Sequence, residues 1–370
     1  MTWVELHKAS EVAAIDAEHA FRQGNITEAT VLYAKAAELE QQALLSVDRT
    51  KTRTRAITAV SVVSLWYKAV AYDRAEQLAH SMLADPSLPH FARADLRNLV
   101  QAIWTENSKK AANVSFLPGQ VFVSVKGGEV ITGGAPLDLI VEKVQTIQSM
   151  FYRTVEFIRD MPLRTRGGPI REIQESCRPW LFQAPPASYQ FAVAIQEAKQ
   201  RDFFKEDTRP DLVAHQFFAI LRATTSEDAK QLEVVVPKTE YRNVFLKLSR
   251  NLAPTGKTFG SIEFRTDADD NSIALTPEAR TVINQTLKKG RPLEAAQSLG
   301  TEEEVIGMLR AVDLEKDFLD VIVNNEPLHV RGVEDEMDDV IGPMVNKRVK
   351  VHVVRDSKGS IHFRDIEVDE

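Results

Sequence analysis

Cysteine is almost absent from this chain of 370 residues, in which Cys177 is the only one. A single cysteine cannot form an internal disulfide, which is typical of proteins from a reducing compartment. The opening residues MTWVELHK lack the apolar core of a secretory signal, and the most apolar stretch, residues 57–72, is interrupted by Lys68 and too short for a membrane span. We therefore expect a cytoplasmic protein without a transmembrane segment.

Recognisable catalytic and metal-binding motifs are also missing. The sequence contains no GxSxG, HExxH or GxGxxG motif, and none of its eight histidines lies at zinc-ligand spacing from another ligand. Residues 255–258 (TGKT) resemble the end of a phosphate-binding loop, but Asn251 stands where that loop needs glycine, and a predicted helix precedes the segment where a strand is required. We therefore expect no catalytic residues, no metal and no cofactor, although catalytic groups can converge only in the fold.

Composition indicates an ordinary globular protein, with 44% hydrophobic and 27% charged residues, and a length that favours two or three domains. The formal net charge of −7 is unevenly distributed. Residues 301–370 carry 9 Lys and Arg against 18 Asp and Glu, whereas residues 1–110 are balanced at 13 of each. Because phosphate neutralisation dominates nucleic-acid affinity, the acidic segment favours solubility or a basic partner over DNA or RNA.

Small and aromatic residues recur at helical spacing near the N-terminus. Ala29, Tyr33 and Ala36 follow a predicted helix over residues 9–22, in which Ala17 and Ala20 mark close helix contacts. Gly24 provides a left-handed stop between the two helices. A second copy contains a helix over residues 56–69 and then the residues Tyr72, Ala75, Ala79, Met82 and Pro86.

This order of residues resembles that of tetratricopeptide repeats, over roughly residues 9–88. Ala29 and Ala75 are 46 residues apart, whereas the family repeats every 34 or so, and no proline follows the first hairpin. Two helical hairpins without repeat ancestry are the alternative. The resemblance implies a protein-binding groove, for which the candidate residues are Trp66, Tyr67 and Tyr72, and packing between helices is the other interpretation of these three aromatics.

The middle of the chain alternates helical and strand patterns and predicts an α+β domain after a linker or last helical turn at residues 105–113. A strand at 121–126 should turn at Gly127 and Gly128 and pair with a short strand at 129–132. The remaining predicted strands cover residues 189–195 and 261–265. The predicted helices cover residues 137–158, 170–177, 211–222, 226–236, 239–252 and 277–288, with Ser226 and Thr276 as caps of two of them.

A basic, glycine-containing loop interrupts this region. Its arginines, Arg164, Arg166 and Arg171, together with Arg178, form the candidate anion-binding segment, and a solvated loop is the alternative. A second basic run lies at residues 49–55. Neither run is interleaved with aromatic residues as in single-strand binders.

Residues 303–370 predict the order β-β-β-α-β-β, with a short acidic helix at 334–344. This order resembles the OB-fold, a five-stranded barrel, while an SH3-like barrel or a plain antiparallel sheet are the alternatives.

The sequence as a whole predicts a multidomain protein. We expect a tetratricopeptide-like all-α helical-repeat module at residues 1–108, an α+β domain at 112–292 and a small all-β, OB-like acidic barrel at 303–370. We interpret it as a non-enzymatic intracellular adaptor or regulatory protein that binds a protein partner, and its general appearance suggests a bacterial accessory or defence system. Nucleic-acid binding through the basic loops and an unrecognised enzyme in the middle domain are the alternatives.

Overall fold

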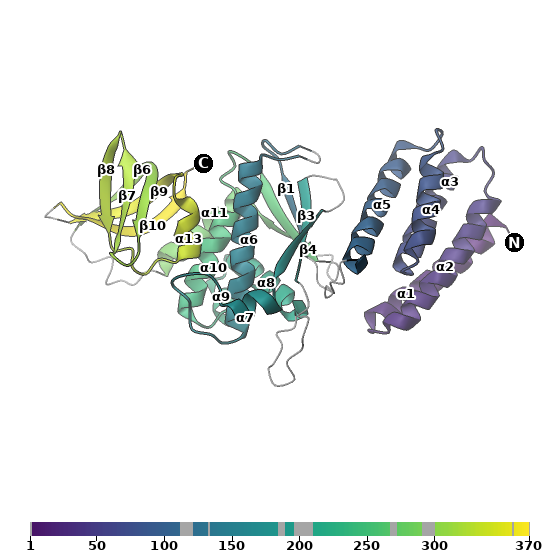
Figure 1. The fold of residues 1–370 in the computed structure, drawn as a ribbon, viewed down its shortest axis with the longest axis horizontal. Coiled ribbons are helices and arrows are strands. Elements are labelled where there is room, and N and C mark those ends of the chain that lie inside the picture. Colours follow the sequence, from purple (N-terminus) through teal and green to yellow (C-terminus); the bar gives the residue numbers. More distant parts are fainter. Residues whose placement is uncertain are drawn as a thin grey trace. The chain divides into compact units, whose positions relative to one another are not determined.

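The computed structural model describes residues 2–111, 121–131, 134–183, 189–195, 210–266, 272–290, 300–356 and 359–369 (Figure 1). The chain divides into two compact units, Met1–Ser115 and Phe116–Glu370. The first unit is helical, and the second combines a mixed α+β region with a C-terminal sheet. None of the described helices is long and apolar enough to cross a lipid bilayer.

Five helices make up the described part of the first unit, and each packs on the next along the chain. They are α1 (Trp3–Arg22), α2 (Ile26–Ser46), α3 (Thr52–Lys68), α4 (Tyr72–Leu83) and α5 (His90–Ala111). The first helix begins well before residue 9, where the sequence placed it. Thr2 and Glu5 form a reciprocal capping box there, with the Glu5 N–H donating to Thr2 Oγ1 and the Thr2 N–H donating to Glu5 Oε2.

The two helical hairpins repeat with a shift of 46 residues. Four of the five buried positions of α1 map onto buried positions of α3, and three buried positions of α2 map onto the three buried positions of α4. The pairs in the first helices are Ser10 and Ala56, Ala13 and Ala59, Ala17 and Val63, and Ala20 and Trp66. The pairs in the second helices are Ala29 and Ala75, Tyr33 and Ala79, and Ala36 and Met82. The seam residues chosen from the sequence therefore lie in the core of this unit.

The turns inside the two hairpins are also equivalent. In the first turn Gly24 has φ 82°, and in the second Val70 has φ 58°, so both residues are left-handed. The next N–H closes the same loop in each case, from Asn25 to the Ala20 carbonyl at 2.9 Å and from Ala71 to the Trp66 carbonyl at 3.0 Å. This is the Schellman arrangement, in which glycine is the usual left-handed residue.

The second unit contains a five-stranded antiparallel sheet in the order β2-β3-β1-β4-β5. Its strands are β1 (Val121–Lys126), β2 (Pro179–Gln183), β3 (Tyr189–Ile195), β4 (Ser261–Thr266) and β5 (Ile273–Leu275). The predicted partner strand at residues 129–132 is wrong over its described residues 129–131, because β1 pairs with β3 and β4 instead, and residue 132 lies outside the described residues. Gly128 packs so tightly on Thr258 that a Cβ would lie 2.2 Å from its carbonyl oxygen, and the Glu129 N–H donates to that same oxygen at 3.0 Å. The chain therefore leaves the turn along the neighbouring loop and does not fold back on β1.

Helices α6 and α10 lie on one side of this sheet (Figure 1). The helices of the mixed region are α6 (Leu137–Ile158), α7 (Arg171–Ser176), α8 (Pro210–Thr224), α9 (Ala229–Val235), α10 (Thr239–Leu252) and α11 (Pro277–Lys289). Alternate residues of β1 join Phe151 and Phe217 in the core, and these two rings stack at 4.4 Å. Thr276 caps α11 as predicted, whereas Asp228 and not Ser226 accepts the hydrogen bond that caps α9.

The C-terminal part of the second unit is a sheet of five strands in the cyclic order β10-β8-β7-β6-β9. The strands are β6 (Gly300–Asp313), β7 (Phe318–Val323), β8 (Glu326–Arg331), β9 (Arg348–Asp356) and β10 (Ile361–Val368). Its neighbouring pairs are antiparallel except β8 and β10, which meet through one parallel pair, Arg331 with His362. A short helix α13 (Asp338–Ile341) and a 3₁₀ turn η1 (Gly342–Met344) connect β8 to β9, as the strand order predicted.

Candidate functional site: a polar pocket beside α13

Basic residues of the mixed region hold the acidic C-terminal part through ion pairs. Two arginines donate from fully buried positions, Arg153 on α6 (0% exposed) and Arg250 on α10 (1% exposed). The short pairs are Arg153 with Asp339 (2.7 Å), Arg250 with Asp365 (2.7 Å), Arg280 with Glu367 (2.8 Å) and Lys247 with Glu336. Two longer pairs join Arg164 to Asp339 (3.5 Å) and Lys257 to Asp369 (3.7 Å). The basic partner expected for the acidic segment is therefore, at least in part, the same chain.

The arginine-rich loop takes part in the same attachment. Arg166 donates to the backbone carbonyls of three residues of the C-terminal part, at 2.7 to 3.1 Å. These residues are Leu314, Glu334 and Glu336. Its planar fork thus clamps the segment that leads into α13.

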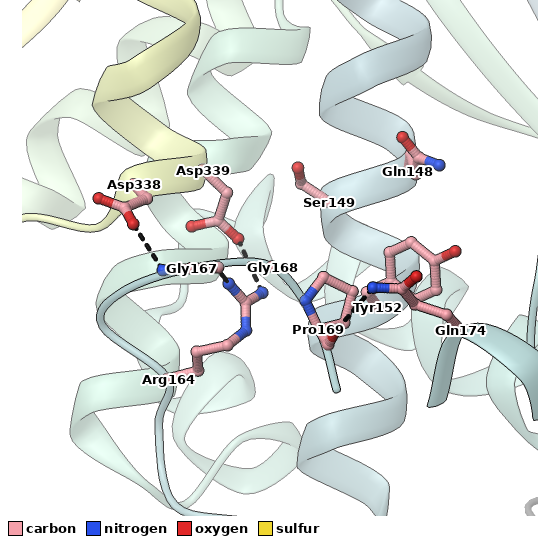
Figure 2. Close-up of a pocket in the computed structure, with 10 residues that line it drawn as sticks. All are labelled: Gln148, Ser149, Tyr152, Arg164, Gly167, Gly168, Pro169, Gln174, Asp338 and Asp339. Atoms are coloured by element: carbon pink, nitrogen blue, oxygen red, sulfur yellow. Dashed lines mark hydrogen bonds and ion pairs between the residues drawn. The ribbon is translucent and has the colours of Figure 1, made fainter. Parts of the chain in front are cut away.

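An open pocket of about 440 Å³ lies beside this attachment (Figure 2). Its walls come from α6, the 164–169 loop, α7 and α13. The lining residues are Gln148, Ser149, Tyr152, Arg164, Gly167, Gly168, Pro169, Gln174, Asp338 and Asp339. The volume falls within the range of small-ligand sites, and the lining is unusually polar for one.

The arginine in the pocket is already neutralised. Arg164 donates from Nε to Glu156 Oε1 at 2.8 Å and lies 3.5 Å from an Asp339 carboxylate oxygen. Asp339 in turn accepts two hydrogen bonds from Arg153, at 2.7 and 2.8 Å. A second carboxylate, Asp338, therefore faces the pocket beside a cation that has two acidic neighbours.

Glycine shapes the wall opposite α6. Gly167 has φ 73°, a conformation that side chains of L residues rarely adopt, and its N–H donates to Asp338 Oδ2 at 2.6 Å. The adjacent Pro169 carbonyl accepts a hydrogen bond from Gln174 Nε2 at 2.7 Å (Figure 2). The loop is thereby tied both to α13 and to α7.

Tyr152 and Ser149 contribute hydroxyls from consecutive turns of α6. Burial raises the pKa of the Tyr152 hydroxyl, and the Arg178 charge and the Gln148 side chain oppose this shift. The Ser149 side chain takes part in none of the hydrogen bonds among the described residues, although it lines the pocket. Its groups are suited to binding by hydrogen bonds.

The structure separates the four predicted anion-binding arginines. Arg164 lines the pocket, Arg166 binds the C-terminal part, and Arg171 is exposed and pairs with Glu175 at 2.7 Å. Arg178 is exposed just before β2. The two arginines nearest the glycines therefore serve internal contacts.

The three aromatics predicted to bind a partner also differ in position. Trp66 is buried, donates from Nε1 to Gln41 Oε1 at 2.9 Å and is covered by the Arg74 guanidinium at 4.6 Å. Tyr67 and Tyr72 are half-buried on either side of the α3–α4 turn, with ring centroids 5.6 Å apart. Only these two present a surface.

Other features considered in the sequence carry no site. The TGKT segment lies between helix α10 and strand β4, the reverse of a phosphate-binding loop, and Cys177 is buried. Within the described ranges, no cluster of three or more His, Cys, Asp or Glu side chains could hold a metal ion.

No pattern in the sequence indicated six of the pocket residues, namely Gln148, Ser149, Tyr152, Gln174, Asp338 and Asp339.

Comparison of the chain with protein-family models, with curated proteins and with solved structures found no match.

Proposed function

We propose that the protein is a non-enzymatic adaptor or regulatory protein whose helical unit binds a protein partner. The observation that carries this proposal is an apolar surface formed by the two equivalent hairpin turns. Phe21 and Ile26 flank the first turn and are each 53% exposed, while Val70 in the second turn is 46% exposed between Tyr67 and Tyr72. We call these five residues the turn patch.

The two turns belong to the same end of the unit. Lys68, at the end of α3, lies 3.8 Å from Glu18 near the end of α1 and 5.2 Å above the Tyr33 ring. Contiguous exposed apolar residues are uncommon on soluble proteins and mark interaction surfaces. A protein partner with an apolar contact face suits this patch, and tyrosine is enriched at such interfaces.

Backbone strain at Val70 supports the same conclusion. A β-branched residue in the left-handed region costs about 1–2 kcal/mol, which glycine at the equivalent position 24 avoids. Strained residues persist where they serve function, and an exposed valine contributes little to the core.

Two finer resemblances are part of the proposal. The 46-residue repeat of buried positions and turns supports a tetratricopeptide-like module, in which repeated hairpins serve as a binding scaffold. The cyclic strand order, with α13 between the third and fourth strands, supports an OB-like C-terminal barrel.

The test is affinity capture from the native cell lysate with and without nuclease treatment, using the full chain. We expect a protein partner that is retained by the wild type and reduced at least tenfold by the double variant Phe21→Ser/Tyr72→Ser. Leu45→Ser is the matched control, since it removes an 80%-exposed apolar side chain near the other end of α2. Equal loss in the control, or recovery of nucleic acid in place of protein, would contradict the proposal.

A further inference from the structure

Two polar groups in the pocket beside α13 are open to a ligand. Asp338 accepts from the Gly167 N–H through Oδ2 alone, and no described residue donates to Oδ1. The Ser149 hydroxyl likewise has no hydrogen-bond partner among the residues that the structure describes, and it is directed into the pocket from α6 (Figure 2). Both groups can accept hydrogen bonds from a ligand.

Two carboxylates, Asp338 and Asp339, and one cation, Arg164, line the pocket, while the charge of Arg178 acts on Tyr152 from outside the lining. Arg164 is paired with Glu156 and Asp339, and Asp339 is held on both oxygens by Arg153. Asp338 takes no part in these ion pairs, so its charge is available to a ligand. An anion such as phosphate would meet two adjacent carboxylates, which opposes its binding.

We propose that this pocket binds an organic cation, an ammonium or guanidinium group, with Asp338 as its charge partner. The Ser149 hydroxyl accepts a second hydrogen bond from the cation, and the Gln148 and Gln174 side chains also line the pocket. Charge-assisted hydrogen bonds of this kind are roughly twice as strong as neutral ones. A cavity of about 440 Å³ accommodates the cationic head and several further atoms.

Binding would couple two parts of the second unit. Asp338 belongs to α13 in the C-terminal part, whereas Ser149 and Tyr152 belong to α6. A cation that contacts both sides adds a link to the ion pairs that already join them. A bound ligand therefore raises the melting temperature of the second unit by mass action. This binding activity is additional to partner binding by the helical unit.

The cation can come from a free small amine or from the Lys or Arg side chain of another protein. Two probes distinguish these sources: methylguanidinium as the free cation, and the blocked peptide acetyl-Gly-Arg-Gly-amide. Methylurea has the same shape as methylguanidinium without the charge and serves as the neutral control. Tighter binding of the peptide indicates a side chain, and tighter binding of the free cation indicates a small molecule.

The experiment is ligand-observed NMR titration of the full-length chain. We expect methylguanidinium to bind with Kd on the order of 1–10 mM, the range for a fragment of about five heavy atoms, and methylurea at least tenfold more weakly. Asp338→Asn should weaken binding about tenfold and Ser149→Ala several-fold. Asp335→Asn is the matched control, since it removes an exposed carboxylate three residues away that does not line the pocket.

The Ser149→Ala variant tests the site separately from Asp338→Asn. Ser149→Ala removes a side chain without described hydrogen bonds, so it tests the site even if Asp338→Asn disturbs the Gly167 contact. If neither methylguanidinium nor the arginine peptide binds, the proposal is overturned. Equal binding by wild type, Asp338→Asn and Ser149→Ala, or preferential binding of inorganic phosphate, would overturn it as well.

Discussion

Gly24 and Val70 occupy the same place in two equivalent turns. Both follow a helix by two residues, and both close a Schellman loop. A Cβ built on Gly24 would meet no atom within 4 Å, so backbone conformation is the main obstacle to a side chain there. Exchange of the two residues therefore measures the left-handed preference together with the packing of the half-exposed Val70 side chain.

Exchange of these residues should shift stability in opposite directions. We expect Val70→Gly to raise the free energy of unfolding of the helical unit by about 1 kcal/mol and Gly24→Val to lower it by about 1–2 kcal/mol. Urea titration followed by circular dichroism measures both changes. If Val70→Gly left stability unchanged or reduced it, the valine would be contributing packing, and the strain argument for the turn patch would fail.

At the scale of helices and strands, buried ion pairs attach α6 to α13 and α10 to β10. Arg250 on α10 donates to both oxygens of Asp365 on β10, at 2.7 and 3.1 Å, and to the Ile366 carbonyl at 2.6 Å. Both side chains are almost completely buried. A buried pair of this kind adds little net stability, but removal of one member leaves a buried charge without its main counter-ion.

Single and double substitutions should therefore differ. We expect Arg250→Met to cost about 3–5 kcal/mol, and the double variant Arg250→Met/Asp365→Leu to cost clearly less, since no charge then loses its partner. Denaturant unfolding of the second unit provides the measurement. An additive or larger loss in the double variant would show that hydrogen bonds to the neighbouring backbone, and not the charge pair, hold this contact.

Glu142 on α6 gives a pH-dependent contribution. Burial raises the pKa of its carboxyl. The neighbouring Lys143 and Lys347 together lower that pKa by more than burial raises it, so the pKa lies below the ordinary value of 4.5. A folded pKa below the unfolded one stabilises the protein above about pH 4.5, and this stabilisation is lost as pH falls through the folded pKa. The difference in unfolding free energy between wild type and Glu142→Gln should be largest near pH 7 and shrink below pH 4. A difference that stays constant across this range would exclude the carboxylate as its cause.

Elements with a strong period were predictable from the sequence, and contacts between distant segments were not. The strands at 189–195 and 261–265 follow from apolar alternation, and the helices at 239–252 and 277–288 follow from helical apolar spacing and, for the second, a capping residue. The false strand at 129–132 arose because local turn chemistry cannot reveal that Thr258 supplies the next hydrogen-bond acceptor. Of the pocket, the sequence indicated Arg164 and the loop glycines. Asp339 and Arg153 are 186 positions apart, so nothing in a local pattern joins them.

At the scale of the whole molecule, two compact units should unfold as two cooperative transitions. We expect calorimetry of the full chain to show two peaks, with Val70→Gly moving only one and Arg250→Met moving only the other. A single peak displaced by both substitutions would mean that the units stabilise each other.

The acidic C-terminal part depends on basic residues of the mixed region to neutralise its charge. The sequence predicts a separate domain at residues 303–370, yet five of its described acidic side chains pair with basic residues of the mixed region: Glu336, Asp339, Asp365, Glu367 and Asp369. A fragment of residues 300–370 loses these partners, while its segment 301–370 carries 18 acidic against 9 basic side chains. We expect it to melt well below the fragment 116–370 and to gain stability as salt rises from 0.01 to 0.2 M, because the Debye length falls from about 30 Å to below 10 Å and screens its self-repulsion. The longer fragment should change little or lose stability over the same range. Equal melting temperatures without salt dependence would show that the sheet needs neither the ion pairs nor the mixed region, and that the acidic face serves another partner.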